Sequence, residues 1–260
     1  MTFKFKVAAA AVAFLAIGAA QAQKAPEPDY TLSAYVGAVN DYRFRGIEQT
    51  GANPALQAGA DFAHKNGFYA GVFTSSVTWV REFNGASAGE REVDYFLGFK
   101  TSVSDIGFDI GAIQYQYPGN NSGATGTQAA GLYADANTTE VYAGVSYGVA
   151  SFKLFQSTSN YMGFLNSSGT KYYDLSFNVD LGNGLTFVPH VGKLTVANQN
   201  NLDYTDYSLT LNKDFGKGWS GSLAYVGNNA NNTAYTASYN GAVNKLLNSP
   251  GGVVGVKYTF

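Results

Sequence analysis

The sequence of 260 residues contains no cysteine, only two histidines and only six prolines. Without cysteine the chain can form neither a disulfide nor a thiolate-ligated metal site. The two histidines, His64 and His190, lie far apart in the sequence, outside any spacing typical of metal ligands. We therefore expect no metal and no cofactor.

Charged residues are also scarce, at 13% of the chain, and the formal net charge is −2. A nucleic-acid partner is not expected, because proteins that bind nucleic acids carry a marked basic excess. Long apolar runs are missing too, since no stretch after residue 22 approaches the ~20 apolar residues of a membrane-spanning helix. Hydropathy alone would indicate a soluble chain, but β-barrels give weak hydropathy signals because their strand faces alternate.

The N-terminus has the pattern of a signal peptide. Lys4 and Lys6 precede an unbroken apolar run from Ala8 to Ile17, and Ala20-Gln21-Ala22 then fits a small-x-small cleavage site. Ten apolar residues are too few for a transmembrane anchor helix, which is the alternative interpretation. We predict a signal peptide over residues 1–22 and a mature chain that starts near Gln23.

Glycine and aromatic residues are abundant, with 31 Gly, 19 Tyr and 18 Phe. Many segments alternate between apolar and polar residues; within 171–181, for example, Tyr173 and Leu175 alternate with Asp174 and Ser176. Such alternation predicts strands with one apolar and one polar face. The expected strands are 31–45, 55–64, 67–80, 91–102, 106–117, 139–148, 151–161, 171–181, 185–196, 203–214, 219–228 and 251–260.

The connections between these strands alternate between short and long. Residues 65–67 and 182–184 are short and contain Asn-Gly pairs, which supply the positive φ that tight hairpins need. Residues 118–138 and 229–250 are long. Short turns at one end and long loops at the other are typical of outer-membrane barrels, and an even strand number places both chain ends on the short-turn, periplasmic side.

These features predict an all-β protein, a transmembrane antiparallel up-and-down β-barrel of about 12 strands over residues 23–260, with no helix after the signal peptide. Ten or fourteen strands would result if a loop were divided wrongly. The alternative is a soluble β-protein that buries its apolar faces. A polar face that is rich in Gly, Ser, Thr and Asn and poor in Lys and Glu argues against that alternative.

The last expected strand, 251–260, carries Tyr258 and Phe260 on its apolar face. This ending resembles the C-terminal assembly signal of bacterial outer-membrane barrels. The expected partners are therefore outer-membrane lipid and the barrel-assembly machinery, and the expected location is the bacterial outer membrane. Aromatic girdles should mark the membrane interfaces, and the candidates on the apolar face are Tyr42, Phe44, Tyr95, Phe99, Tyr207, Phe215, Tyr258 and Phe260.

Four stretches carry a family resemblance: residues 40–47 (NDYRFRGI), 54–59 (PALQAG), 67–71 (GFYAG) and 92–99 (EVDYFLGF). They resemble the TorF family of proteobacterial porin-like proteins, a conserved family of unknown function, although that family has Ser where Glu48 stands. The resemblance covers residues 30–100, and beyond them only the strand spacing and the terminal Phe agree. It implies an outer-membrane channel but no established substrate and no catalytic residues.

If Tyr42 and Phe44 face lipid, the alternating residues Asp41, Arg43 and Arg45 face the lumen. This phase is preferred because an arginine at mid-depth on the lipid face costs ~2–4 kcal/mol. The candidates for the lumen or a constriction are Asp41, Arg43, Arg45, Asp61, Asp94, Lys100, Asp174 and His190.

Two roles are open for these charges. Arg43 and Arg45 could face Asp61 and Asp94 across a constriction and bias the passage of ions and solutes. Alternatively, the charges could form a salt-bridge network that only fills and rigidifies the barrel. Twelve strands lie between the side-chain-filled eight-stranded barrels and the wide 16–18-stranded porins, so we expect a narrow channel.

The predicted function is passive diffusion of small hydrophilic solutes or ions through an outer-membrane channel. The alternative is a non-conducting barrel whose long loops, 118–138 and 229–250, bind a partner. The chain has no His-Glu-x-x-His motif and no phosphate loop, so we do not expect an enzyme. A hydrolase that uses His190 as its base is the remaining catalytic hypothesis.

Overall fold

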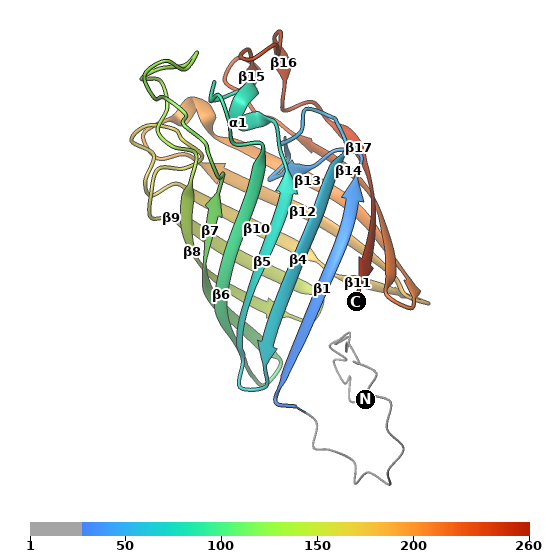
Figure 1. The fold of residues 1–260 in the computed structure, drawn as a ribbon. Helices are drawn as coiled ribbons and strands as arrows, with labels where there is room; N and C mark the ends of the chain where they lie inside the picture. The colour runs from blue at the N-terminus through green and yellow to red at the C-terminus, as the bar shows by residue number, and fades with distance from the viewer. Residues whose placement is uncertain (1–27) are drawn as a thin grey trace, which may run out of the picture.

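The computed structural model describes residues 28–260, and one antiparallel sheet in it forms a closed barrel (Figure 1). The predicted signal peptide, residues 1–22, lies outside the described residues. The barrel strands are β1 (Tyr30–Val39), β4 (Ala55–His64), β5 (Phe68–Ser76), β6 (Arg91–Val103), β7 (Ile106–Gln116), β8 (Thr138–Tyr147), β9 (Ala150–Ser157), β10 (Lys171–Phe177), β11 (Val179–Gly182), β12 (Leu185–Thr195), β13 (Tyr204–Gly216), β14 (Trp219–Asn228) and β17 (Gly251–Thr259).

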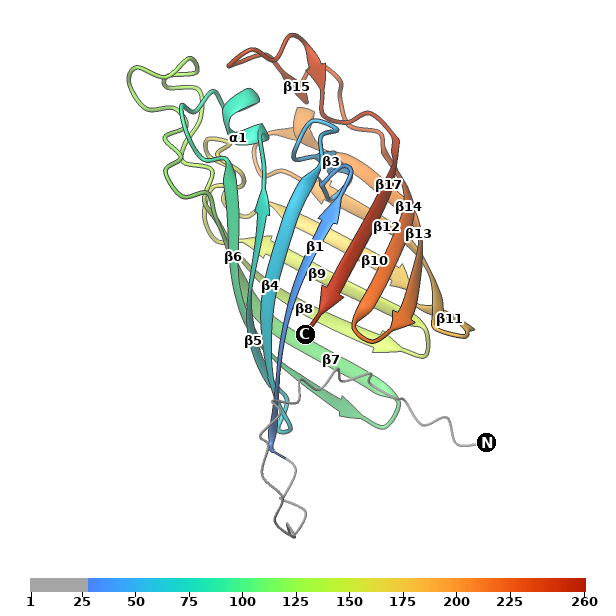
Figure 2. The ribbon, with the colours of Figure 1, turned by 45° about the vertical axis from the view of Figure 1, so that its right-hand side comes forward.

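The barrel has twelve strands in space. β10 and β11 both pair with β12 and form one strand that is interrupted at Asn178. β1 and β17 close the barrel, with Tyr35–Val39 antiparallel to Gly255–Thr259, and they lie side by side in Figure 2. Closure leaves the last strand paired on both sides, with β1 and β14. The predicted all-β, up-and-down barrel of about 12 strands is therefore confirmed.

The two ends of the barrel differ as the sequence predicts. Strands β4 and β5, β6 and β7, β8 and β9, β11 and β12, and β13 and β14 are joined by tight turns at one end. Long loops join the strands at the other end, at the top of Figure 1, and they contain α1 (Trp79–Glu82), the 3-10 turn η1 (Asn200–Leu202), β15 (Thr236–Ala237) and β16 (Lys245–Leu246).

Four predictions about the elements are wrong. The seventh expected strand, 151–161, ends at Ser157. The first strand ends at Val39 instead of residue 45, because Asn40 turns the chain inward and its side chain bonds β17, accepting from the Val254 amide (2.6 Å) and donating to the Gly252 carbonyl (3.2 Å). The third strand ends at Ser76, and the residues after it form α1. The expectation of no helix is therefore also wrong, although α1 has only four residues.

The faces of the sheet are inverted relative to those of a soluble protein. Leu56 and Leu209 point outward and are 75% and 50% exposed, whereas Asp206, inward on the same strand as Leu209, is 2% exposed. A continuous apolar exterior of this kind suits hydrocarbon and would be unstable in water. No helix among residues 28–260 is long and apolar enough to cross a membrane.

Glycines keep the lumen from being filled by its many aromatic side chains. Inward-facing Tyr35, Tyr69 and Tyr142 lie over Gly59, Gly98 and Gly111 on adjacent strands, where a Cβ atom would overlap the ring. A ring that covers a glycine lies flat against the sheet instead of projecting across the barrel. This pairing explains part of the high Gly and Tyr content.

Candidate functional site

A loop folded into the barrel forms the centre of the candidate site. Residues 40–54, here called the inserted loop, contain a small hairpin of β2 (Arg43–Phe44) and β3 (Ile47–Glu48). Arg45 and Gly46 turn the hairpin with φ of 49° and 80°. The Asn228 amide group donates to the Gly46 carbonyl at 2.9 Å and ties the hairpin to β14.

Arg43 stabilises the inserted loop from within. Its Nε donates to Asp41 Oδ2 at 2.7 Å and its Nη2 to Glu48 Oε1 at 3.1 Å, while Nη1 donates to the Ser249 carbonyl. All three charged side chains are buried. Charge-assisted bonds among buried groups hold the loop in one geometry and neutralise the arginine locally.

Arg45 anchors the hairpin to the barrel wall. Its Nη1 and Nη2 donate to the two carboxylate oxygens of Glu140 at 2.8 and 2.7 Å, in the bidentate geometry that only arginine provides. The guanidinium also lies 4.2 Å from the ring centre of Tyr172 and 4.8 Å from that of Phe44. Burial raises the pKa of Tyr161 to about 12, so this phenol is neutral where it accepts from Arg45 Nη1 at 3.3 Å.

His190, on β12, lies between two carboxylates of the neighbouring strands β10 and β13. Its Nε2 is 3.2 Å from Asp174 Oδ2, and its Nδ1 is 3.7 Å from Asp206 Oδ1. The Tyr172 hydroxyl reaches both Asp206 oxygens (3.1 and 3.2 Å) and His190 Nε2 (3.3 Å). Together with the inserted loop, these residues line a cavity of about 320 Å³.

Two further carboxylates face the inserted loop from β6. Glu92 is 1% exposed, and neither of its carboxylate oxygens has a hydrogen-bond partner among the described residues. Asp94, two residues on along the same face, likewise has one unpartnered oxygen in this part of the structure. We call the inserted loop, together with the side chains that face it, the neck. These side chains are Glu92, Asp94, Tyr115, Glu140, Tyr172, Asp174, His190 and Asp206.

The other half of the lumen, toward the short turns, has a different charge pattern. The ammonium groups of Lys100, Lys153 and Lys257 lie 4.6, 5.0 and 5.2 Å from the ring centres of Tyr69, Tyr142 and Tyr35. Lys153 also pairs with Asp109 at 2.7 Å, and Asp61 is close enough to Lys257 and Lys100 to interact with both electrostatically. We call this half the vestibule.

The structure brings together some of the predicted site residues and separates others. Asp41, Arg43, Arg45, Asp94, Asp174 and His190 belong to the neck, whereas Asp61 and Lys100 belong to the vestibule. In the described residues Arg43 forms ion pairs with Asp41 and Glu48, and Arg45 forms an ion pair with Glu140. A role for these residues in selectivity stays a prediction.

Tyr42 and Phe44 do not face lipid, which corrects the expected girdle. Both side chains pack on the buried cluster inside the barrel, and their rings contact Phe73 and Tyr115. Arg43 and Arg45 thus lie inside the barrel as expected, although the premise that Tyr42 and Phe44 face lipid is wrong. The sequence reasoning missed Glu48 and Glu92. Glu92 could have been found, because it lies two residues before Asp94 and therefore on the same face of the strand.

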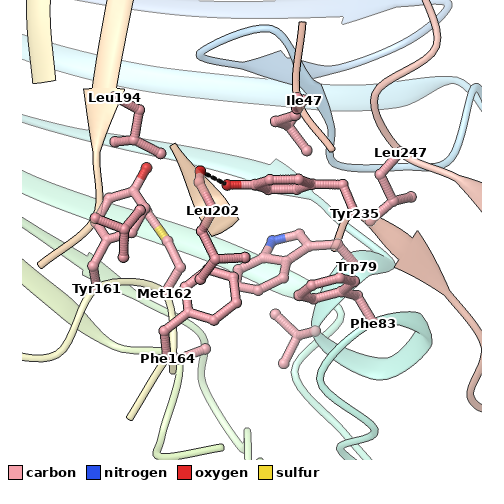
Figure 3. Close-up of a cluster of buried hydrophobic side chains, with 14 of the residues drawn as sticks. Ile47, Trp79, Phe83, Tyr161, Met162, Phe164, Leu194, Leu202, Tyr235 and Leu247 are labelled. Carbon is pink, nitrogen blue, oxygen red and sulfur yellow. Dashed lines mark hydrogen bonds between the residues drawn. The ribbon is translucent and has the colours of Figure 1, made fainter. Parts of the chain in front are cut away.

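An apolar cap covers the neck at the long-loop end (Figure 3). We define the cap by the ten labelled side chains Ile47, Trp79, Phe83, Tyr161, Met162, Phe164, Leu194, Leu202, Tyr235 and Leu247. The Tyr235 hydroxyl donates to the Leu202 carbonyl at 2.7 Å, and the ring of Phe83 contacts those of Phe164 and Tyr235. The long loops therefore pack against each other as a small hydrophobic core across the barrel mouth.

Two features bear on the hydrolase hypothesis. Among the described residues no serine hydroxyl forms a hydrogen bond with His190, whose ring nitrogens face Asp174, Asp206 and Tyr172. The loop before β6 contains a Gly-x-Ser-x-Gly sequence at residues 85–89, but Ser87 is exposed and bonded to Asn121. That loop lacks the strand-to-helix turn in which this motif presents a nucleophile.

A closed barrel that is apolar outside and polar inside, with a loop folded into its lumen, defines the class of porin-like β-barrels. Within it, the chain belongs to the family described as bacterial protein of unknown function (Gcw_chp), whose model matches residues 22–260. The expected family of porin-like barrels without assigned function is confirmed in this coarse form. The name TorF stays a prediction.

Solved structures show the same fold. The KdgM porin in complex with disordered oligogalacturonate matches with a TM-score of 0.51 and 10% identity, over 88% of this chain and 99% of that chain. The NanC porin matches with the same TM-score, identity and coverage. At this identity the likeness establishes the fold alone. A search of curated proteins found no match.

Proposed function

We propose that this chain is an outer-membrane channel through which small hydrophilic solutes or ions diffuse passively. A polar lumen inside a closed, externally apolar barrel is the observation that carries the proposal. The proposal is supported by a cavity in the neck and another in the vestibule, because each is lined by charged and hydroxyl side chains. The inserted loop would act as the constriction, because it places Arg43 and Arg45 inside the barrel.

The proposal includes a route to the membrane. Residues 1–22 would direct export as a cleaved signal peptide, and Tyr258 and Phe260 would be read by the barrel-assembly machinery. The two rings are in edge contact at 5.1 Å, and Phe260 is exposed on the lipid-facing side. An aromatic ending of this kind is accessible for recognition before the barrel closes.

A second candidate function is favoured by the cap. Because the long loops pack into a hydrophobic core across the mouth, a non-conducting barrel that presents these loops to a partner is also consistent with the structure. In the channel proposal the cap must open or leave a side path, whereas in the alternative it is a permanent closure.

Conductance in planar bilayers separates the two candidates. We expect stepwise currents from the purified, folded wild-type protein, and larger or longer steps from Phe83→Ala, which removes ring contacts in the cap with Tyr133, Phe164 and Tyr235. The control is Leu132→Ala, a truncation of an exposed side chain in a neighbouring loop. Silence from both the wild type and Phe83→Ala, with heat-modifiable folding intact, would favour the binding barrel.

A further inference from the structure

The cavity in the neck has a net negative charge whichever way its histidine titrates. The two arginines are already matched, Arg43 by Asp41 and Glu48 and Arg45 by Glu140. The remaining ionisable groups on the cavity wall are Asp174, Asp206 and His190. Two carboxylates share one imidazole, so this trio is anionic with the imidazole protonated and more so when it is neutral.

One of these carboxylates is open to a ligand. Asp174 uses Oδ2 to face His190, its side chain is 28% exposed, and no hydrogen bond to its Oδ1 occurs among the described residues. In contrast, the donors of Arg43 and the Nη groups of Arg45 are occupied by carboxylates and a carbonyl. An anion that entered would find the arginines already paired, whereas a cation would find a carboxylate with free lone pairs.

The rest of the wall decides which kind of cation fits. Phe44 and Phe155 provide apolar surface, and the volume of about 320 Å³ is within the range of small-molecule sites. Among residues 28–260 no group of three or more acidic, histidine or cysteine side chains could hold a metal ion. The walls therefore fit a small organic molecule with one charged end better than a bare ion.

We propose that this cavity is a binding site for small organic cations, with the ammonium group on the open oxygen of Asp174 and the apolar body against Phe44 and Phe155. This inference deepens the proposed channel function. It rests on that function where it names the class of solute, since a solute that crosses the channel would bind briefly at this site. The mixture of acidic and aromatic groups then makes protonated amines the preferred solutes over anions of the same size.

Calorimetric titration of the folded protein in detergent tests the site with three probes of one shape: benzylamine, benzyl alcohol and benzoate. We expect benzylamine to bind and the other two to bind much more weakly. Asp174→Asn, which keeps the size of the side chain and removes its charge, should weaken benzylamine by about fivefold, the effect of losing one partly solvated charge contact. Equal binding of the three probes, or tighter binding of benzoate, would overturn the site.

Asp180→Asn is the matched control. Asp180 follows on the same strand line and lies six residues from Asp174, roughly 20 Å toward the short turns. This substitution should leave benzylamine affinity unchanged; an effect as large as that of Asp174→Asn would mean a diffuse charge effect and no local site.

Bilayer measurements on the same samples keep this inference distinct from the channel proposal. Current without benzylamine binding leaves the channel and removes the cation site. Binding that depends on Asp174, in a protein that passes no current, removes the channel and leaves the site. When both hold, a KCl gradient should give a reversal potential of the sign for cation preference, smaller in Asp174→Asn than in Asp180→Asn.

Discussion

At the scale of single residues, the neck is built from charges that compensate each other inside the barrel. Arg45 and Glu140 form a bidentate pair in which the Glu140 side chain is fully buried. Removing two such charges from water is costly, and the cost is recovered only while both partners are present. The pair therefore does more to fix where the inserted loop lies than to increase the overall stability.

Replacing Glu140 by Gln should strongly destabilise this arrangement. Loss of one partner leaves the Arg45 guanidinium buried without its counter-charge, which costs about 3–5 kcal/mol in comparable buried pairs. Urea unfolding of the barrel in detergent should show the loss. Lys65→Ala is the control, because Lys65 and Asp29 form an exposed pair worth at most about 1 kcal/mol. Equal effects of the two substitutions would contradict the account.

At the scale of elements, the inserted loop has the most influence on the lumen. Gly46 allows it to lie against the wall, since a Cβ atom there would be 2.7 Å from Asp206 Cβ and the backbone has φ of 80°. The hairpin is only two residues per strand and depends on Arg43, Arg45 and Asn228 for its position. Its position is therefore fixed by these side-chain contacts and not by the hydrogen-bond ladder of the barrel sheet.

Gly46→Val should displace the hairpin from β13 and widen the neck. We expect single-channel conductance to rise by about twofold, because the constriction sets the resistance of a narrow pore. Gly131→Val is a matched control: Gly131 has φ of 76°, so the backbone strain is alike, but no heavy atom lies within 4 Å of its Cβ position. A control that changes conductance as much as Gly46→Val would show that strain, and not the clash at Asp206, is responsible.

The elements also show where sequence reasoning succeeds and where it ends. Strand faces follow from a period of two, so Leu209 outward and Ser208 inward could be predicted from the sequence. The inserted loop could not, because residues 40–47 also alternate; the decision to leave the sheet depends on Asn40 bonding β17, more than 200 residues away. The cap was missed for the same reason, since Trp79, Phe83 and Tyr235 meet only when the barrel has closed.

At the scale of the whole molecule, one inverted sheet accounts for the stability of the barrel in lipid and for the polar lumen on which the proposed function rests. The barrel strands present mainly aliphatic and aromatic side chains outward, and small polar, charged and tyrosine side chains inward. Closure satisfies the backbone polar groups that an open edge would expose to hydrocarbon. The twelve-stranded cylinder is wide enough to hold both the inserted loop and the cavity beside it.

A pair of adjacent substitutions on β13 tests this inversion. Leu209→Arg places a charge in lipid near the middle of the strand and should cost about 2–4 kcal/mol in urea unfolding from lipid vesicles. Ser208→Arg adds the same side chain one residue away on the lumen side, beside the neck cavity, and should leave stability nearly unchanged while reducing any preference for cations. Similar losses of stability in both variants would mean that the two faces are not distinct.

The charge of the lumen also differs along its axis: the neck has surplus carboxylates, whereas in the vestibule Lys100, Lys153 and Lys257 are balanced by Asp61, Asp109 and Asp214. Mobile cations gather in the neck, whereas the balanced charges of the vestibule favour neither sign of ion. A voltage that is positive on the neck side drives cations and anions toward the boundary between neck and vestibule and raises the ion concentration there. The opposite voltage depletes this boundary of ions. An oriented single molecule should behave as a diode, with an asymmetric current–voltage curve that becomes symmetric in molar salt, where screening shortens to about 3 Å.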